Sequence, residues 1–264
     1  MFSKNMDEIQ YCSLGSGSKG NATLVAFGDT LIMVDCGFSL KECVKRLELK
    51  GIQPQQITAI LVTHEHADHI AGVARLSNCY SIPVWLSKGT SLHKASQKIE
   101  QCNIFNSHSG FSIQQIKVEP VHVPHDAREA TQFIFSAASC TLGLLTDVGT
   151  ITPHIVNRYQ LCDALLLEFN YDHQMLMQGR YPYSLKQRVS GELGHLSNQQ
   201  AFDFLSQLNP ERLFQLVIMH VSQQNNSSDI ITNLLESLDK FKDLKVEIAS
   251  QVFGFEWRAI SKVI

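Results

Sequence analysis

Apolar residues in this chain follow two patterns, short continuous runs and stretches with helical spacing. Continuous runs of a few apolar residues between turn residues are typical of buried β-strands, whereas apolar positions three and four apart indicate amphipathic helices. The first part of the chain is therefore predicted to contain strands over residues 9–14, 22–27, 30–34, 57–62 and 83–86, and helices over residues 40–49, 70–76 and 87–97.

The rest of the chain repeats this alternation. Further strands are predicted over residues 116–123, 132–136, 141–145, 164–169 and 213–219, followed by a last pair that closes the chain. Further helices are predicted over residues 152–159, 197–208 and 229–241, the first opened by Pro153 and the second capped by Ser197. Because this order occurs twice without a Pro/Gly-rich linker, we expect an α/β fold in a single domain over residues 1–264. Its architecture would be an αββα sandwich, two mixed β-sheets packed face to face with helices outside.

Composition narrows the class of protein. Hydrophobic residues make up 44% of the chain and charged residues 18%, which predicts a well-cored protein rather than a disordered one. The net charge of -3 gives no global basic field, so strong non-specific affinity for nucleic acid is not expected. We expect a cytoplasmic protein, because the chain has seven cysteines without a CxxC pair and no apolar stretch of membrane-spanning or signal-peptide length.

Four metal-ligand residues follow the predicted strand over residues 57–62. This tetrad, His64, His66, Asp68 and His69, places groups that are costly to bury at the end of a buried strand, and a metal ion would replace the hydration they lose. In an extended segment His64 and His66 point the same way and can bind one ion. Asp68 and His69 follow where the chain is predicted to turn into a helix, so the loop can serve two neighbouring metals.

Three more candidate ligands, His125, Asp147 and His220, also stand where an apolar strand ends. His122 competes with His125 for the same role. Histidine and carboxylate ligands suit zinc best, with manganese and ferrous iron as alternatives.

The tetrad and the later ligands together resemble the metallo-β-lactamase superfamily. The tetrad resembles its HxHxDH signature, and Asp35, after the strand over residues 30–34, resembles its first motif. The resemblance implies a metallo-β-lactamase fold with two divalent cations. One cation would be held by His64, His66 and His125. The other would be held by Asp68, His69 and His220, with Asp147 bridging the pair and Asp35 supporting the loop.

Other positions resemble particular branches of the superfamily. An acid at Asp147 argues against a true β-lactamase, and too few residues separate it from His195 for the inserted domain of the β-CASP nucleases. His195 resembles a histidine of the PhnP-type and tRNase-Z-type phosphodiesterases. The glycine-rich loop over residues 15–21, the His-Asp-Ala around His125 and the segments over residues 180–186 and 194–197 resemble the YycJ/WalJ group. Members of that group are DNA 5′–3′ exonucleases.

These resemblances imply a dinuclear phosphodiester hydrolase, a nuclease acting on DNA, in which a metal-bridging hydroxide attacks phosphorus. His195 is the candidate acid or phosphate ligand, and Asp68 is the other candidate catalytic residue. Substrate contacts are expected from Ser18 and Asn21, in a loop whose backbone N–H groups can form an anion nest, and from Arg180, Lys186 and Arg188. The three basic residues can instead form a solvated face.

Three other functions remain open. A glyoxalase-II-like thioesterase has a nearly identical metal set, and a small-molecule phosphodiesterase, of the cyclic nucleotide type, needs the same chemistry. A non-catalytic metal-binding protein would bind the ions without hydrolysing any ester. An oxygen-reducing diiron role is disfavoured, because His66 stands where that branch has glutamate.

Overall fold

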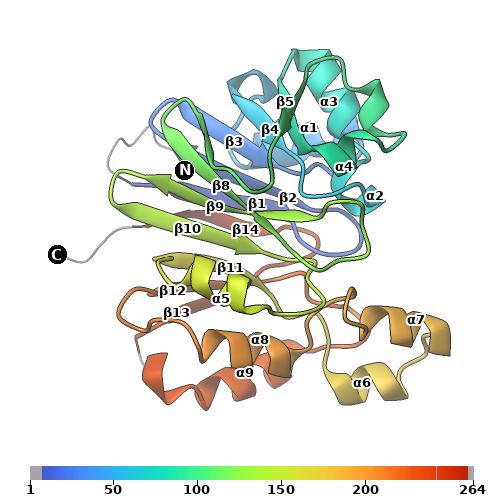
Figure 1. Ribbon diagram of the computed structural model, residues 1–264, viewed down its shortest axis with the longest axis vertical. Coiled ribbons are helices and arrows are strands. Elements are labelled where there is room, and N and C mark those ends of the chain that lie inside the picture. The colour runs from blue at the N-terminus through green and yellow to red at the C-terminus, as the bar shows by residue number, and fades with distance from the viewer. Residues whose placement is uncertain (1–7, 242, 261–264) are drawn as a thin grey trace.

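Two seven-stranded sheets stack face to face in the computed structural model, which describes residues 8–241 and 243–260 (Figure 1). In spatial order the first sheet contains β14 (Phe255–Ala259), β1 (Gln10–Gly15), β2 (Ala22–Phe27), β3 (Thr30–Val34), β4 (Ala59–Leu61), β5 (Val84–Ser87) and β6 (Cys102–Phe105). The second contains β13 (Lys245–Ile248), β12 (Gln215–Met219), β11 (Ala164–Glu168), β10 (Cys140–Leu145), β9 (Thr131–Ala137), β8 (Ile116–His122) and β7 (Phe111–Ile113).

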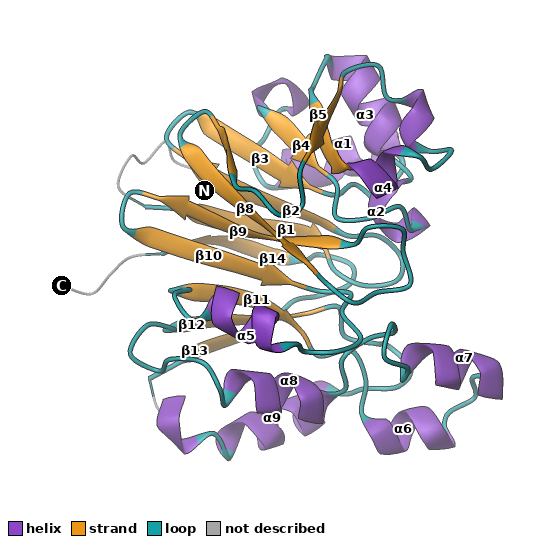
Figure 2. Cartoon of the chain, in the orientation of Figure 1, coloured by secondary structure: helices purple, strands orange, loops and turns teal. Residues whose placement is uncertain are grey.

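Helices cover the two outer faces of this sandwich (Figure 2). The first sheet is covered by α1 (Leu40–Leu49), α3 (Val73–Tyr80) and the short α2 (Ala67–Ile70) and α4 (Lys88–Ser91). The second is covered by α5 (Pro153–Tyr159), α8 (Asn198–Leu205) and α9 (Ser228–Glu236). Two helices, α6 (His173–Gln178) and α7 (Tyr183–Val189), project from one end of the sandwich. The predicted αββα architecture is confirmed, while the single domain over residues 1–264 stays a prediction.

Successive side chains of a buried strand point to opposite faces of its sheet. Apolar side chains therefore pack both against the other sheet and against the covering helices. On β1, Tyr11 packs between the two sheets, whereas its neighbour Cys12 packs beneath the helices together with Leu47 of α1. A strand buried on both faces needs apolar residues at every position, and for this reason these strands are continuous apolar runs in the sequence.

The carboxyl ends of several strands meet at one edge of the sandwich. In the first sheet β3 and β4 pair parallel, and in the second β10, β11 and β12 pair parallel. The backbone N–H of Thr131 donates to the carbonyl of Thr63 at 3.0 Å, which joins the second sheet to the chain just after β4. Residues that follow these strands are therefore gathered in one place.

Several details differ from the sequence-based prediction, among them the unpredicted strand β6. The predicted helix over residues 87–97 is wrong: only α4 and a 3₁₀ turn (Ser96–Lys98) form, and beyond α4 the Ser96 hydroxyl donates to the Thr90 carbonyl at 2.6 Å in competition with a helical backbone bond. The helix predicted over residues 229–241 ends at Glu236, before a 3₁₀ turn. The last two strands do not pair with each other but lie in different sheets, and α6 and α7 were not predicted. No described helix has the length and apolar character needed to cross a membrane, and the cytoplasmic location stays a prediction.

Candidate metal centre

Three candidate residues leave their strands through a left-handed backbone turn. Asp35 follows β3 with φ 61°, Asp147 follows β10 with φ 52°, and His220 follows β12 with φ 52°. Such φ values are strained for residues other than glycine and persist where the surroundings fix them, often at functional sites. Here the backbone N–H of His220 donates to Ser16 Oγ at 2.8 Å, and that of Asp147 donates to Glu168 Oε2 at 2.9 Å.

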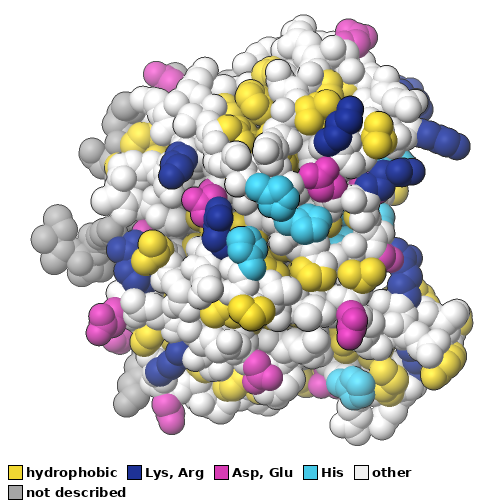
Figure 3. Space-filling model, viewed as in Figure 1, with side chains coloured by type: hydrophobic (Ala, Val, Ile, Leu, Met, Phe, Trp, Pro, Cys, Tyr) yellow, Lys and Arg dark blue, Asp and Glu magenta, His cyan; other side chains and the backbone are white. Residues whose placement is uncertain are grey.

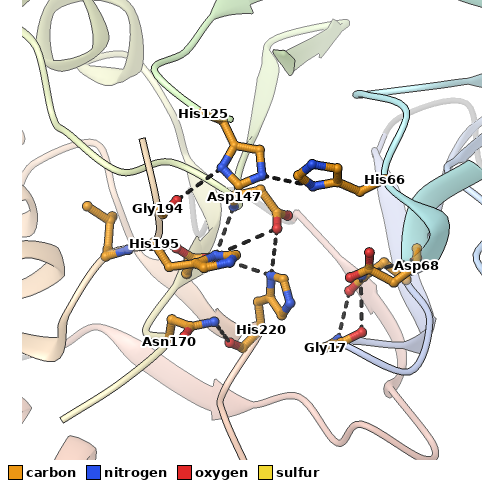
Figure 4. Close-up of polar contacts among 12 residues, drawn as sticks. Gly17, His66, Asp68, His125, Asp147, Asn170, Gly194, His195 and His220 are labelled. Carbon is orange, nitrogen blue, oxygen red and sulfur yellow. Dashed lines mark hydrogen bonds and ion pairs between the residues drawn. The ribbon is translucent and has the colours of Figure 1, made fainter. Parts of the chain in front are cut away.

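The first ligand group contains His64, His66 and His125, whose ligand atoms lie within 4.8 Å of one another. His66 Nδ1 lies 3.2 Å from His125 Nε2, and the two rings face each other (Figure 4). The opposite nitrogens have their own partners: His125 Nδ1 donates to the carbonyl of Gly194 at 3.0 Å, and His66 Nε2 to that of Asp126 at 3.2 Å. These contacts direct the facing nitrogens toward a shared ion.

His122 stands apart from this group. It ends β8 with an exposed side chain, and its ring centroid lies 6.5 Å from that of His108. The structure therefore places His125, and not its competitor His122, beside His64 and His66.

The second ligand group forms around Asp147. His69 Nε2 lies 3.4 Å from Asp147 Oδ2 and 3.6 Å from Asp68 Oδ2, while His220 Nδ1 lies 3.1 Å from Asp147 Oδ1. His69 Nδ1 donates to Asp35 Oδ2 at 2.8 Å, so Asp35 orients this ring without reaching the centre. Asp147 lies between the two groups, because His64, His69 and Asp147 also come within 4.8 Å of one another.

Burying three polar atoms of these groups would cost free energy if no cation were bound. His64 Nε2, Asp147 Oδ2 and His220 Nδ1 are buried, and although the last two have ion-pair contacts, none of the three makes a hydrogen bond of good geometry to the described residues. Buried polar atoms of this kind need a partner, and a divalent ion supplies one. The two His/Asp clusters fit a dinuclear metal site.

Glu168, at the end of β11, is a member of this centre that the sequence-based prediction missed. Its wholly buried carboxylate lies 3.1 Å from His195 Nδ1 and 3.2 Å from His220 Nδ1, and it accepts from the backbone N–H of Leu196 at 2.8 Å. The sequence does contain a sign of this role, because Glu168 is the single acid in the apolar run over residues 164–169. A buried acid needs charged or hydrogen-bonding partners.

Comparison with known proteins agrees with this geometry. Residues 30–220 match the family described as the Beta-lactamase superfamily domain. The chain belongs to the metallo-β-lactamase superfamily. It is 29% identical to exodeoxyribonuclease WalJ of Streptococcus pneumoniae over 94% of this chain and 95% of that protein. It is 30% identical to exodeoxyribonuclease YycJ of Bacillus anthracis over 84% of this chain and 86% of that protein. The fold matches the metallo-β-lactamase fold protein YhfI of Bacillus subtilis with a TM-score of 0.72, at 16% identity, over 96% of this chain and all of that one.

Carboxylates shift the pKa values of the candidate ligands in this superfamily centre. Burial alone would lower the pKa of His220, but the carboxylates of Asp147 and Glu168 outweigh it and raise that pKa to about 10. Burial likewise opposes a charged His69, yet Asp147 and Asp35 hold its pKa well above the usual value. The pKa of Asp147, which burial would raise, is held well below its usual value by His220 and His69.

Metal binding is therefore expected to release protons. A cation must displace the protons on His69 and His220, so its apparent affinity should rise with pH until it approaches the His220 pKa of about 10. Titrating Zn²⁺ into metal-free protein at about pH 7, in buffers of different ionisation enthalpy, measures the protons released. A binding enthalpy independent of the buffer would contradict this assignment.

Only some of the candidate substrate residues lie next to the candidate metal centre. A pocket of about 360 Å³ is lined by Asp147, His195 and His220 together with Ser18 and Arg188. Asn21 lies deeper, with its side-chain amide 3.3 Å from the carbonyl of Asp68. The structure does not bring Arg180 and Lys186 to this pocket: Arg180 is exposed, and Lys186 Nζ donates to the carbonyl of Met177 at 2.6 Å.

The glycine-rich loop over residues 15–21 does not form the anion nest that its sequence suggested. The backbone N–H of Gly17 donates to Asn21 Oδ1 at 2.7 Å, that of Lys19 to Gln251 Oε1 at 3.1 Å, and that of Gly20 to the Gly17 carbonyl at 3.0 Å. These donors hold the loop in place instead. Its Ser16 hydroxyl fixes the backbone of His220, so the loop supports a metal ligand.

Gly37 allows the chain after Asp35 to pass close to Asp68. A Cβ atom added at Gly37 would lie 1.9 Å from the Asp68 carbonyl oxygen, which is backbone and cannot rotate away. Gly37→Ala should therefore displace Asp68 and weaken metal binding roughly 10- to 100-fold, as loss of a supporting contact commonly does. Equilibrium dialysis against Zn²⁺ measures this. Gly110→Ala, whose added Cβ would lie 3.4 Å from the nearest atom, is the matched control and should bind normally.

Proposed function

We propose that this metal-dependent hydrolase cleaves phosphodiester bonds in DNA and removes nucleotides from a 5′ end. The observation that carries the proposal is His195, which lines the metal pocket and pairs with the wholly buried Glu168 at 3.1 Å between Nδ1 and Oε2. A phosphodiester releases an alkoxide, which needs a proton, and this pair can provide one. Relatives named exodeoxyribonucleases, matched along most of their length, support DNA as the substrate.

The two ligand groups would hold the metals, with zinc proposed first and manganese or iron as alternatives. His64, His66 and His125 would bind one ion, and Asp68, His69 and His220 the other, with Asp147 shared. When bound, such a pair supplies an activated water and neutralises the charge on the phosphate oxygens.

His195 would then protonate the leaving oxygen. Burial would lower the pKa of His195, but Glu168 together with Asp147 outweighs it and raises that pKa, which favours the protonated ring. Since Nδ1 faces Glu168, Nε2 is the nitrogen that can deliver the proton. Asp68 lines the same pocket and would serve both as a ligand and in positioning the phosphate.

The surface suits a local contact with DNA rather than a broad electrostatic one. On the face in Figure 3, Lys and Arg side chains are spread among acidic ones, with several along the right-hand edge, the side on which α2 and α7 lie in Figure 1. This distribution agrees with the net charge of -3 and favours binding of a strand near the pocket.

Metal-loaded protein incubated with single-stranded DNA labelled at either end tests the proposal. Early release of labelled mononucleotide from the 5′-labelled strand is expected, together with gradual shortening of the 3′-labelled strand. Hydrolysis of S-lactoylglutathione with no cleavage of DNA would instead identify a thioesterase. Turnover of cyclic nucleotides alone would identify a small-molecule phosphodiesterase.

A further inference from the structure

Helix α7 forms one wall of the metal pocket although none of its residues is buried. Tyr181, Leu185 and Val189 are spaced four residues apart, and all three line the pocket while remaining half-buried. Leu185 and Val189 share one face of α7, and Tyr181 precedes the helix, directly before its N-cap Pro182. The wall is therefore aromatic and aliphatic, whereas Asp68 and Asp126 contribute carboxylates to the same pocket.

Hydrogen bonds tie this wall to the metal ligands. Just beyond α7, the carbonyl of Gly194 accepts from His125 Nδ1 at 3.0 Å, and the carbonyl of Val189 accepts from the backbone N–H of His195 at 2.9 Å. Within α7, Arg188 Nε donates to Asp126 Oδ2 at 2.6 Å, next to His125 in the chain. The apolar face is thus held at a fixed position relative to the metal centre.

A nucleotide has a flat, apolar base close to its phosphate, and the pocket offers an apolar wall next to the proposed phosphate-binding centre. The phosphate must lie at the metals, and the group attached nearby that is both flat and apolar is the base. An aromatic ring stacks on any of the four bases, which gives affinity without sequence preference, but it reaches the face of a base only when that base is unstacked from its neighbours.

We propose that Tyr181, with Leu185 and Val189, forms the platform on which an unpaired base next to the scissile phosphate stacks. This inference rests on the proposed phosphodiesterase function and specifies its substrate as a single-stranded end. Tyr181 is thereby a specificity-determining residue. Arg188 is a positioning residue, because its contact with Asp126 holds the platform against the metal loop.

The test compares substrates with and without bases. Tyr181→Ala should lower kcat/KM for a single-stranded oligonucleotide by roughly ten-fold or more, the usual effect of removing a stacking ring. It should leave within about two-fold the rates on a fully abasic strand and on the same strand with abasic residues at the cleaved end, since neither offers a ring to stack at the cleaved end. Tyr181→Phe, which keeps the ring, should retain activity on DNA.

Tyr183→Ala is the matched control, because Tyr183 stands two residues after Tyr181 at the start of α7, is 73% exposed and does not line the pocket. It should behave as the wild-type protein on all three substrates. Equal losses with Tyr181→Ala on base-bearing and base-free substrates, or no loss on either, would overturn the platform. Failure of the wild-type protein to cleave any phosphodiester would instead overturn the proposed function.

Discussion

Asp147→Asn is expected to abolish DNA cleavage and to leave the protein with less than its full metal content. Asp147 lies between the two ligand groups, since it comes within 4.8 Å of His64 in the first group and Oδ1 lies 3.1 Å from His220 Nδ1 in the second. An asparagine keeps the size of the side chain but replaces one oxygen by an NH2 group, which donates hydrogen bonds and cannot bind a cation, and it also removes the negative charge. Loss of a supporting contact costs roughly 10- to 100-fold, so loss of a shared direct ligand should exceed that range.

Metal analysis by mass spectrometry together with cleavage rates measures both effects. Asp163→Asn is the matched control, because Asp163 is equally buried but accepts from the backbone of Thr141 at 2.8 Å and pairs with Arg212 at 3.0 Å, outside both ligand groups. It should lower stability while leaving the metal content unchanged. Full activity of Asp147→Asn with both metals bound would exclude a bridging role.

The second large effect is expected for His195→Asn. If His195 protonates the leaving oxygen, cleavage of DNA should fall roughly 10²- to 10⁴-fold, the usual contribution of a general acid. Methyl p-nitrophenyl phosphate releases nitrophenolate, which leaves without a proton, so its hydrolysis should change little. Glu168→Gln should also slow the cleavage of DNA more than that of methyl p-nitrophenyl phosphate, but by a smaller factor. The neutral glutamine side chain stabilises the charged imidazole ring of His195 less than the glutamate carboxylate does.

The metal content of the His195→Asn variant distinguishes a general acid from a metal ligand at this position. His195 and Glu168 lie within 4.8 Å of Asp147 and His220, close enough to hold an ion together with them. Equal losses on both substrates, accompanied by loss of one metal, would make His195 a ligand rather than an acid. Retained metal with loss confined to DNA agrees with the proposed acid.

The sandwich could be predicted because its strands are buried on both faces and appear as continuous apolar runs. The tetrad could be recognised because charged and imidazole groups directly after such a run are costly without a metal. Helices α6 and α7 were missed for the opposite reason: α7 buries no residue, and Leu185 and Val189 alone are too short an apolar pattern to indicate a helix. The capping carboxylate of Asp172, which accepts from the N–H of Met175, was the available sign of α6.

The arrangement of the centre depends on contacts between distant segments, which local patterns do not contain. The left-handed backbone of His220 is fixed by Ser16, more than two hundred residues away in the chain. Arg188 lines the pocket and pairs with Asp126, a contact that the sequence did not indicate, and its contact with phosphate stays a prediction. The choice between His122 and His125 also needed the geometry, because both stand near the end of the same strand.

Titrating Zn²⁺ into metal-free protein while following the cleavage of single-stranded DNA tests the central claim most directly. If two ions act together in the proposed nuclease, activity should rise to a plateau at two equivalents of metal per chain and disappear when a chelator is added. Full activity at one equivalent would contradict a dinuclear mechanism, and absence of DNA cleavage at two bound equivalents would contradict the nuclease function.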